Sequence, residues 1–468
     1  MSPLGTALLA CAVAFGVAPA SAAPHRPPNV VLILMDDMGW RDVGFMGNEF
    51  AETPHLDRLA KRGLVFTQAY ASAPNCAPTR ACLMSGQCTP RHGIYTVVDP
   101  RQPPGSPWHK LRAADSRSDL APEIVTLPEA LQARGYATAF FGMWNLGRGR
   151  TGPVTPGGQG FETVVFPENL GFAKDAYVDG DGNQLSDRLT DEVLRFIERQ
   201  KAGPFFVYLA DHAIHAPYDP EPDLLAKYER KAVAAGDERN DAAQAATIEA
   251  VDRNVGRIVE RLGRLGLADD TLLIFTSDNG GTSRSTPPLK GGKGELFEGG
   301  IRVPLVIAGA GVAKPGTTCD VPVASIDFYP TLVDLAGGTP GRQLDGASLA
   351  PLLRGGAVAR ERLFWHFPCY VGRATPASAV REGRYKLVEF FEDGGHVELY
   401  DLEADPGERT DLARTKPEQA ARLAGALHAW QRETEAALPS GANPAYDPHA
   451  ERPRGGGPKA DRGRRGRR

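Results

Sequence analysis

Cysteine is scarce in this chain of 468 residues, which contains only six. A content this low excludes a small scaffold held together mainly by disulfides. One of the six, Cys11, lies in an apolar N-terminal stretch, and removal of that stretch leaves five, an odd number. In an oxidising compartment at least one of the five must then be unpaired or chemically modified. We expect this to be Cys76, while the pairing of the others stays open: Cys82, Cys88, Cys319 and Cys369.

Positive charge is missing from the first 24 residues, which contain no Lys or Arg. The apolar run at residues 4–23 nevertheless ends in small residues and is followed by a polar segment, which predicts a cleaved signal peptide over residues 1–23. A membrane anchor is disfavoured because the run is short and is interrupted by Gly16, Pro19 and Ser21. We therefore expect a periplasmic or secreted protein without a membrane span.

A strong overall charge is also missing, since 53 Lys and Arg stand against 57 Asp and Glu, a net charge of −4. Residues 451–468 hold eight Lys or Arg and two acidic residues, a local charge of +6, which leaves −10 for the other 450 residues. A Gly- and Arg-rich run of this kind is typical of a disordered, solubilising end. We predict a disordered basic tail over residues 441–468 and no nucleic-acid partner.

Internal repeats are absent as well, so a repeat architecture is not predicted. Instead, short apolar runs end in polar clusters and alternate with segments of helical pattern. Continuous apolar runs suit strands that are buried on both faces of a sheet. The predicted strands are residues 30–34, 138–141, 205–209 and 272–275, and the predicted helices are residues 53–60, 127–133, 189–200 and 242–265.

This alternation predicts an α/β fold with a mainly parallel or mixed central sheet flanked by helices. From about residue 360 the pattern changes to short strands in hairpins and a closing helix. These elements are residues 363–367, 378–381, 385–390 and 397–400, and then 416–437. We predict a main α/β domain over residues 24–355 and a smaller C-terminal antiparallel sheet-plus-helix subdomain over residues 356–440.

Acidic and amide side chains follow two of the predicted strands. Asp36 and Asp37 come after the first strand, and Asp278 and Asn279 come after the last strand of the main domain. Because the carboxyl ends of parallel strands meet at one edge of a sheet, we expect these side chains to lie together. Three carboxylates and one amide oxygen form a hard-oxygen set that suits Ca²⁺ or Mg²⁺.

The segment Cys76-Ala77-Pro78-Thr79-Arg80 begins a short predicted helix. Cys76 therefore lies at the positive end of that helix, where a nucleophile or an anion is favoured. Taken alone, a five-residue pattern of this kind recurs by chance, and a cysteine is more often a small buried apolar residue. Its interpretation depends on the rest of the chain.

Six motifs spread over residues 29–412 together resemble the formylglycine-dependent sulfatases, within the alkaline-phosphatase-like superfamily. They are L-M-D-D-M-G-W (34–40), C-A-P-T-R (76–80), H-A-P (215–217), T-S-D-N-G-G (276–281), G-G-K-G-E-L-F-E-G-G-I-R-V-P (291–304) and L-Y-D-L (399–402). The combination is highly specific, whereas each motif alone is not.

The resemblance implies that a formylglycine-generating enzyme oxidises Cys76 to an aldehyde. One hydroxyl of its hydrate would attack sulfur, and the second would expel the covalent sulfate. The resemblance also implies a divalent cation, Ca²⁺ rather than Mg²⁺, bound by five residues: Asp36, Asp37, residue 76, Asp278 and Asn279. Arg80 is implied to steady the diol, Lys293 to contact the sulfate, and His215 to donate a proton to the leaving-group oxygen.

One segment departs from this resemblance. The family's G-K-W-H-L-G is replaced by G-M-W-N-L-G at residues 142–147, so Met143 and Asn145 stand where a lysine and a histidine are expected. Met143 cannot bind sulfate, and Asn145 can hydrogen-bond but cannot act as a base near neutral pH. Each loss is expected to slow turnover by about a hundredfold or more. The usual T-G-R after the cysteine motif is also changed, to Ser85-Gly86-Gln87.

We predict a sulfatase that hydrolyses a sulfate ester of a glycan or of an aryl or alkyl group. Two alternatives stay open. One is a phosphodiester or phosphonate ester hydrolase with the same fold and modified residue. The other is a non-catalytic protein that binds sulfated glycans, which Met143 and Asn145 favour and the retained Cys76, Arg80 and Lys293 disfavour. Residues 101–122 and 367–377 are expected to set the substrate, whose identity the sequence does not give.

Overall fold

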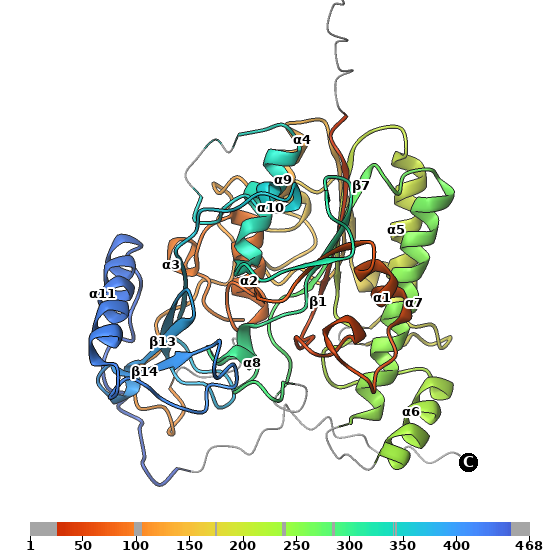
Figure 1. Ribbon diagram of the computed structural model, residues 1–468. Helices are drawn as coiled ribbons and strands as arrows, with labels where there is room; N and C mark the ends of the chain where they lie inside the picture. Colours follow the sequence, from red (N-terminus) through yellow and green to blue (C-terminus); the bar gives the residue numbers. More distant parts are fainter. Residues whose placement is uncertain are drawn as a thin grey trace, which may run out of the picture.

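The computed structural model describes residues 26–97, 105–173, 176–235, 240–282, 286–339, 341 and 344–450. Eight strands form a central sheet (Figure 1). Their spatial order is β5 (Thr163–Val165), β4 (Ala137–Gly142), β6 (Phe205–Asp211), β1 (Asn29–Met35), β7 (Thr271–Ser277), β8 (Val306–Gly309), β2 (Gly63–Phe66) and β9 (Thr317–Cys319). The strands from β5 to β7 are parallel, and β8 runs antiparallel to both β7 and β2. The sheet is therefore mixed, with β1 near its centre.

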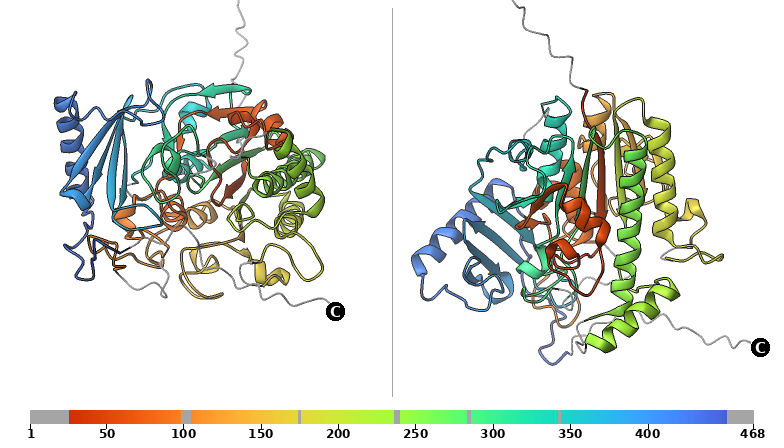
Figure 2. Two further views of the ribbon diagram at one scale, coloured as in Figure 1. Left: turned by 90° about the horizontal axis from the view of Figure 1, so that it is seen from below. Right: turned by 45° about the vertical axis from the view of Figure 1, so that its right-hand side comes forward.

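Helices cover both faces of this sheet (Figures 1 and 2). One face carries α1 (Pro54–Ala60), α5 (Leu185–Gln200) and α7 (Ala242–Arg264), with α6 (Pro222–Ala235) against α7. The opposite face carries α2 (Cys76–Ser85), α4 (Leu127–Gln132), α9 (Phe328–Leu335) and α10 (Ala350–Leu353). The shorter helices are α3 (Thr89–His92), α8 (Glu298–Ile301), η1 (Gly44–Met46), η2 (Gly157–Gln159), η3 (Pro167–Leu170), η4 (Ser325–Asp327) and η5 (Phe391–Asp393).

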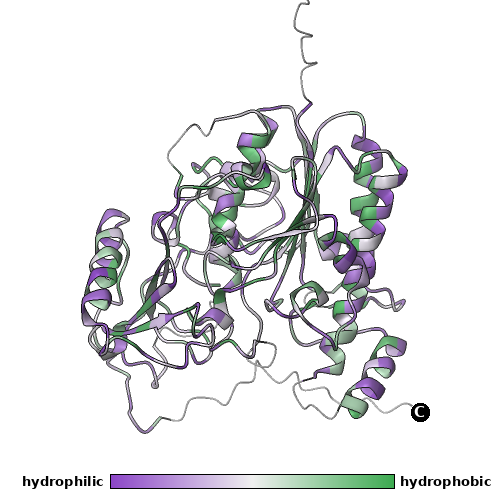
Figure 3. Cartoon of the chain, viewed as in Figure 1, coloured by the Kyte–Doolittle hydropathy of each residue, from purple (hydrophilic) through white to green (hydrophobic). Residues whose placement is uncertain are grey.

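The central strand shows why the apolar runs are continuous. Along β1, Leu32 and Leu34 point into the core on the α2 side, whereas Val31 and Ile33 point into the core on the α5 and α7 side. Successive side chains of a strand face opposite ways, so a strand covered on both faces must be apolar throughout. Figure 3 shows the same contrast: the central strands are green, whereas α5 and α7 carry both colours.

The C-terminal subdomain is a separate four-stranded antiparallel sheet with one long helix. It comprises β11 (Arg362–Phe367), β12 (Ala377–Glu382), β13 (Tyr385–Phe390), β14 (His396–Asp401) and α11 (Pro417–Glu433). One face packs against α11 through Leu423 and Leu427. The other packs against the main domain, where Trp365 meets Tyr70 of β3 (Ala69–Tyr70), the partner strand of β10 (Val323–Ala324). Figure 2 shows the two sheets side by side.

The predicted fold class is confirmed: a mixed central sheet lies between helices and is followed by an antiparallel sheet and a helix. The predicted disorder from residue 441 is wrong for residues 441–450, because Ala442 pairs with Leu111 and the Asn443 side chain donates to the carbonyls of Ser106 and His109. Residues 1–23 and 451–468 lie outside the described part. In the described part, no helix is both long and apolar enough to cross a bilayer.

Candidate functional site

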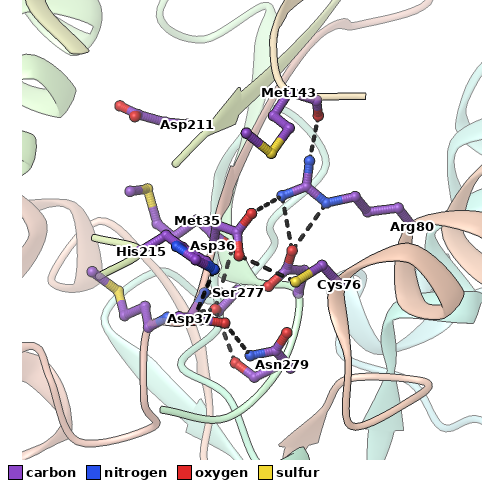
Figure 4. A network of polar contacts seen from close by, with 12 residues as sticks. Met35, Asp36, Asp37, Cys76, Arg80, Met143, Asp211, His215, Ser277 and Asn279 are labelled. Atoms are coloured by element: carbon purple, nitrogen blue, oxygen red, sulfur yellow. Dashed lines mark hydrogen bonds and ion pairs between the residues drawn. The ribbon is translucent and has the colours of Figure 1, made fainter. Parts of the chain in front are cut away.

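Three carboxylates lie at the carboxyl ends of the neighbouring parallel strands β1 and β7 (Figure 4). Asp36 and Asp37 follow β1, and Asp278 follows β7, where its N–H donates to the Met35 carbonyl at 3.0 Å. Asp37 has a φ of 67°, a left-handed conformation that Asp adopts more readily than most residues. Its N–H donates to Oδ1 of Asp278 at 3.3 Å. The turn thus brings all three buried carboxylates into one cluster.

Asn279 completes this edge of the sheet. Its Nδ2 donates to Oδ1 of Asp37 and to the Gly280 carbonyl, both at 2.8 Å. Its Oδ1 is buried and has no hydrogen-bond partner among the described residues. A buried acceptor without a donor is costly, so this oxygen is a candidate ligand for a cation.

The buried helix α2 supplies the next two side chains. Cys76 is its first residue, and its Sγ donates to Oδ1 of Asp36 at 3.3 Å. Arg80 lies four residues later, on the same face of the helix, and is fully buried. Helix α2 therefore presents a thiol and a guanidinium to the carboxylates that follow β1 and β7 (Figure 4).

Arg80 connects the carboxylates of the two strands. Its Nη2 donates to Oδ2 of Asp36 and to Oδ2 of Asp278, both at 2.8 Å, and its Nε donates to the same Asp278 oxygen at 2.9 Å. Its Nη1 donates to the Met143 carbonyl. Charge-assisted hydrogen bonds of this kind fix the position of the carboxylates and favour their ionised form.

The cluster carries excess negative charge. Burial and then the charge of Asp36 raise the pKa of Asp278 to about 7, against the lowering effect of Arg80. Burial also acts to raise the pKa of Asp36, but Arg80 and then Lys293 outweigh it and lower this pKa to about 2. Two cations thus face three carboxylates, and a bound divalent cation would supply the missing positive charge.

The residues present fit such a cation. Asp36, Asp37, Asp278 and Cys76 each offer one ligand atom, and these four atoms lie within 4.8 Å of one another. Together with the orphaned Oδ1 of Asn279, the carboxylates form an oxygen set that suits Ca²⁺ or Mg²⁺. Sulfur is a poor ligand for these hard cations, so the thiol fits less well than an oxygen at position 76 would.

The Cys76 thiol is not activated in this setting. Burial raises its pKa well above the usual value, and the negative charge of Asp36 raises it further. The thiol therefore stays protonated near neutral pH and is a weak nucleophile.

Two further predicted residues lie beside Asp37. Lys293 Nζ is 2.6 Å from its Oδ1, and His215 Nε2 is 3.6 Å from its Oδ2. His215 turns its Nδ1 to the Ala216 carbonyl at 2.9 Å, so Nε2 is the nitrogen that faces the site. The side chains are 22% and 42% exposed, whereas Arg80 is fully buried, so this is the side from which a ligand can enter.

The structure adds contacts that no sequence motif indicated. The Met143 carbonyl accepts from Arg80, a backbone role that does not depend on the side chain. His212, one residue beyond β6, is buried, and its Nδ1 has no partner among the described residues. Burial lowers its pKa. Its position directly after a buried strand was the available signal.

The two loops that were expected to set the substrate meet next to Lys293. The His109 ring stacks on Tyr370 with centroids 3.7 Å apart, and the Leu111 N–H donates to the Tyr370 hydroxyl at 3.0 Å. Val371 lies so close to Gly294 that a Cβ on this glycine would be 3.2 Å from it. The described parts of both loops therefore form one continuous structure beside the open side of the site.

Comparison with protein families finds two matches. The family model "Sulfatase" matches residues 28–338, and the model "N-sulphoglucosamine sulphohydrolase, C-terminal" matches residues 292–433. Together they span the main domain and the C-terminal subdomain.

Individual relatives agree with this. The chain is 32% identical to a sulfatase of Formosa agariphila, over 87% of this chain and 89% of the relative. It is 33% identical to human arylsulfatase A, over 84% of this chain and 85% of the relative. Among solved structures, Ps i-CgsB in complex with k-i-k-neocarrahexaose has a TM-score of 0.72 and 25% identity, covering 88% of this chain and 95% of that one.

Proposed function

Because the chain belongs to the sulfatase family of sulfuric ester hydrolases, within the alkaline-phosphatase-like superfamily, we propose that it hydrolyses a sulfate ester of a sugar. The observation that carries the proposal is the hydrogen bond from Cys76 to Asp36 in the middle of the carboxylate cluster, which places the modifiable residue at the cation site. A sugar substrate is supported by the match of residues 292–433 to the sulphoglucosamine sulphohydrolase model.

The nucleophile in this proposal is formylglycine made from Cys76 by a formylglycine-generating enzyme. The high pKa of the buried thiol supports this, because an unmodified cysteine here is a poor nucleophile. The hydrated aldehyde supplies the chemistry that a thiol lacks, since it offers one hydroxyl for attack and a second for release of the product.

The cation, Ca²⁺ in preference to Mg²⁺, would be held by Asp36, Asp37, Asp278, Asn279 and an oxygen on residue 76. When bound, it supplies a Lewis acid for the nucleophile and neutralises sulfate oxygens. Arg80 donates hydrogen bonds to Asp36 and Asp278 from the buried side of the site, and so fixes the position of these carboxylates around residue 76. The same hydrogen bonds keep the guanidinium from turning towards substrate.

Lys293 and His215 occupy the open side of the site. Burial acts to lower the pKa of Lys293, but the negative charges around it outweigh burial and raise this pKa well above its usual value. Its ammonium therefore stays charged and can bind a sulfate oxygen. His215 presents Nε2 next to the same opening, where it can give a proton to the departing sugar oxygen.

One observation favours a second function. Met143 and Asn145 supply neither a cation nor a base in the 142–147 segment, so the alternative is a protein that binds sulfated glycans without hydrolysing them. The contact from Arg80 to the Met143 carbonyl survives this change, because it uses the backbone.

We also propose a periplasmic or secreted location, in keeping with the signal peptide predicted over residues 1–23.

Mass spectrometry of the tryptic peptide that spans residues 63–80 tests the proposal. This peptide contains Cys76 as its sole cysteine, and the adjacent peptide 81–91 contains Cys82 and Cys88 as internal controls. Protein from cells that carry a formylglycine-generating enzyme should show an aldehyde at Cys76 and thiols in the control peptide. It should then hydrolyse sulfate esters faster than phosphate or phosphonate esters. An unmodified Cys76 under these conditions would favour the binding protein instead.

A further inference from the structure

A second group of buried charges lies where the main domain meets the C-terminal sheet. Lys386 of β13 has its Nζ 3.0 Å from Oε1 of Glu298 and 3.0 Å from Oε1 of Glu408. Glu408 also accepts the Glu298 N–H at 2.7 Å. All three residues are at most 1% exposed. Because buried charges are tolerated only when they are closely paired, this cluster holds its members in one geometry.

Residues of the main domain contact the other oxygen of the Glu298 carboxylate. The Tyr70 hydroxyl donates to Oε2 of Glu298 at 2.8 Å, and Arg302 Nη1 lies 3.6 Å from that oxygen. Arg381 of β12 in turn donates to the Tyr70 hydroxyl. Glu298 is therefore the point at which charged groups of both parts of the chain converge.

Glu298 belongs to a tightly folded segment, residues 290–300, which we call the lysine loop because it carries Lys293. The Gly299 N–H donates to the Lys290 carbonyl at 2.8 Å. A Cβ on Gly300 would lie 2.0 Å from the Glu295 carbonyl oxygen, and one on Gly299 would lie 2.5 Å from the Gly291 carbonyl oxygen. The two ends of the loop thus touch, and a shift of Glu298 must be passed on to the rest of it.

The lysine loop is also hydrogen-bonded to the site. The Gly294 N–H donates to the Pro74 carbonyl at 2.7 Å, two residues before Cys76. The Lys293 N–H donates to the Gly281 carbonyl at 3.1 Å, two residues after Asn279. The loop therefore lies between the buried charge cluster and the carboxylates, and it is connected to both.

We propose that the ion cluster of Glu298, Lys386 and Glu408 is the anchor by which the C-terminal subdomain sets the position of the Lys293 ammonium in the site. Lys386 and Glu408 are positioning residues, since neither touches the aspartates of the site or the Cys76 thiol. The expected effect on turnover rests on the proposed sulfate-binding role of Lys293. The expected effect on the position of the lysine loop is independent of that role.

Three variants isolate this effect. Lys386→Met removes the cation from the anchor. Arg384→Met is the matched control, because Arg384 precedes the same strand but pairs with Asp401 at the surface. Leu427→Ala opens a cavity between α11 and the C-terminal sheet, so it destabilises the subdomain without touching Glu298. Should Lys386→Met fail to fold, Glu298→Gln removes the negative charge that Lys386 contacts while keeping an oxygen that can accept the Tyr70 hydroxyl hydrogen bond.

The first readout is hydrogen exchange in peptides that cover residues 286–301. We expect the anchor variants to exchange at least about threefold faster there, and the two controls to stay within about twofold of the wild type. The second readout is the KM for nitrophenyl sulfate, which should rise at least about fivefold in the anchor variants, by a larger factor than kcat falls.

Unchanged exchange in residues 286–301 of both anchor variants would overturn the proposal, and so would an equal increase in Leu427→Ala. Lys293→Met separates the anchor from the function. If exchange rises but neither the anchor variants nor Lys293→Met change KM, the anchor stands and the sulfate-binding role of Lys293 fails. If Lys293→Met raises KM and the anchor variants do not, the anchor does not set the position of Lys293.

Discussion

Replacement of Arg80 by methionine should be the most damaging single change to this site. Arg80 is fully buried and makes three hydrogen bonds of 2.8–2.9 Å to carboxylates that are at most 1% exposed. Methionine fills part of the same space but cannot donate a hydrogen bond. Asp36 and Asp278 would then face each other without the guanidinium between them.

The magnitude follows from the burial of the pair. Removing one partner of a buried ion pair typically costs about 3–5 kcal/mol, because an uncompensated charge stays in the interior. Asp278 can relieve part of this cost by taking up a proton, since its pKa is already about 7 with Arg80 in place. We therefore expect Arg80→Met to lower the free energy of unfolding by about 3 kcal/mol near neutral pH.

Urea denaturation in the presence of a chelator measures this loss. The control is Arg264→Met on α7, where the ion pair with Glu260 is exposed (67% and 61%) and should be worth less than about 0.5 kcal/mol. Added Ca²⁺ should restore part of the loss in Arg80→Met, because the cation neutralises the same carboxylates. A loss below about 1 kcal/mol, or one equal to that of Arg264→Met, would refute our view that Arg80 compensates a buried negative cluster.

Three further predictions concern the site and the domain junction. The double variant Met143→Lys/Asn145→His should raise kcat for a sulfate ester at least about tenfold, and a steady-state assay that shows no rise would mean that these positions do not limit turnover. In thermal unfolding followed by fluorescence, CaCl₂ should raise Tm more than MgCl₂ does, and Asn279→Leu should weaken the Ca²⁺ effect about tenfold in concentration; equal curves for the two proteins would exclude Asn279 as a ligand. Burial raises the pKa of Glu408 from 4.5 to about 7, so its contribution to stability is fully present below pH 4.5 and is lost as the pH rises through 7, by at most about 3 kcal/mol. Glu408→Gln should remove this pH dependence of the free energy of unfolding. Urea denaturation at pH 5 and pH 8 should therefore show the variant gaining stability relative to the wild type at the higher pH. The same pH dependence in both proteins would contradict this prediction.

The sequence predicts well that the carboxylates of the site and Asn279 cluster at one edge of the sheet, because the information is local. Asp36, Asp37, Asp278 and Asn279 each follow an apolar strand, and parallel strands place such residues at one edge. The position of Cys76 at the start of a helix is also a local property, and α2 begins at this residue. In each case a short pattern fixes both the element and the direction of the side chain.

The sequence could not predict contacts between distant parts of the chain. Glu298, Lys386 and Glu408 meet from positions that no periodicity links, and a buried lysine in a strand looks the same in sequence as an exposed one. The contact of Arg80 with the Met143 carbonyl is hidden for another reason, because a backbone acceptor leaves no trace in residue type. The ordered structure of residues 441–450 depends on hydrogen bonds from Asn443 to backbone carbonyls that are more than 300 residues earlier in the sequence.

The depth of Cys76 has a consequence for how the active molecule is made. Only 3% of this residue is exposed, and the helix that carries it is buried along its whole length. In the function we propose, a formylglycine-generating enzyme could not reach this thiol once the chain has folded, so the oxidation would have to act on the nascent or unfolded polypeptide. Modification would then compete with folding, and a molecule that folds first would keep its thiol. Under this proposal the fraction of active protein is decided during synthesis, and faster folding or a shortage of the modifying enzyme would lower it permanently.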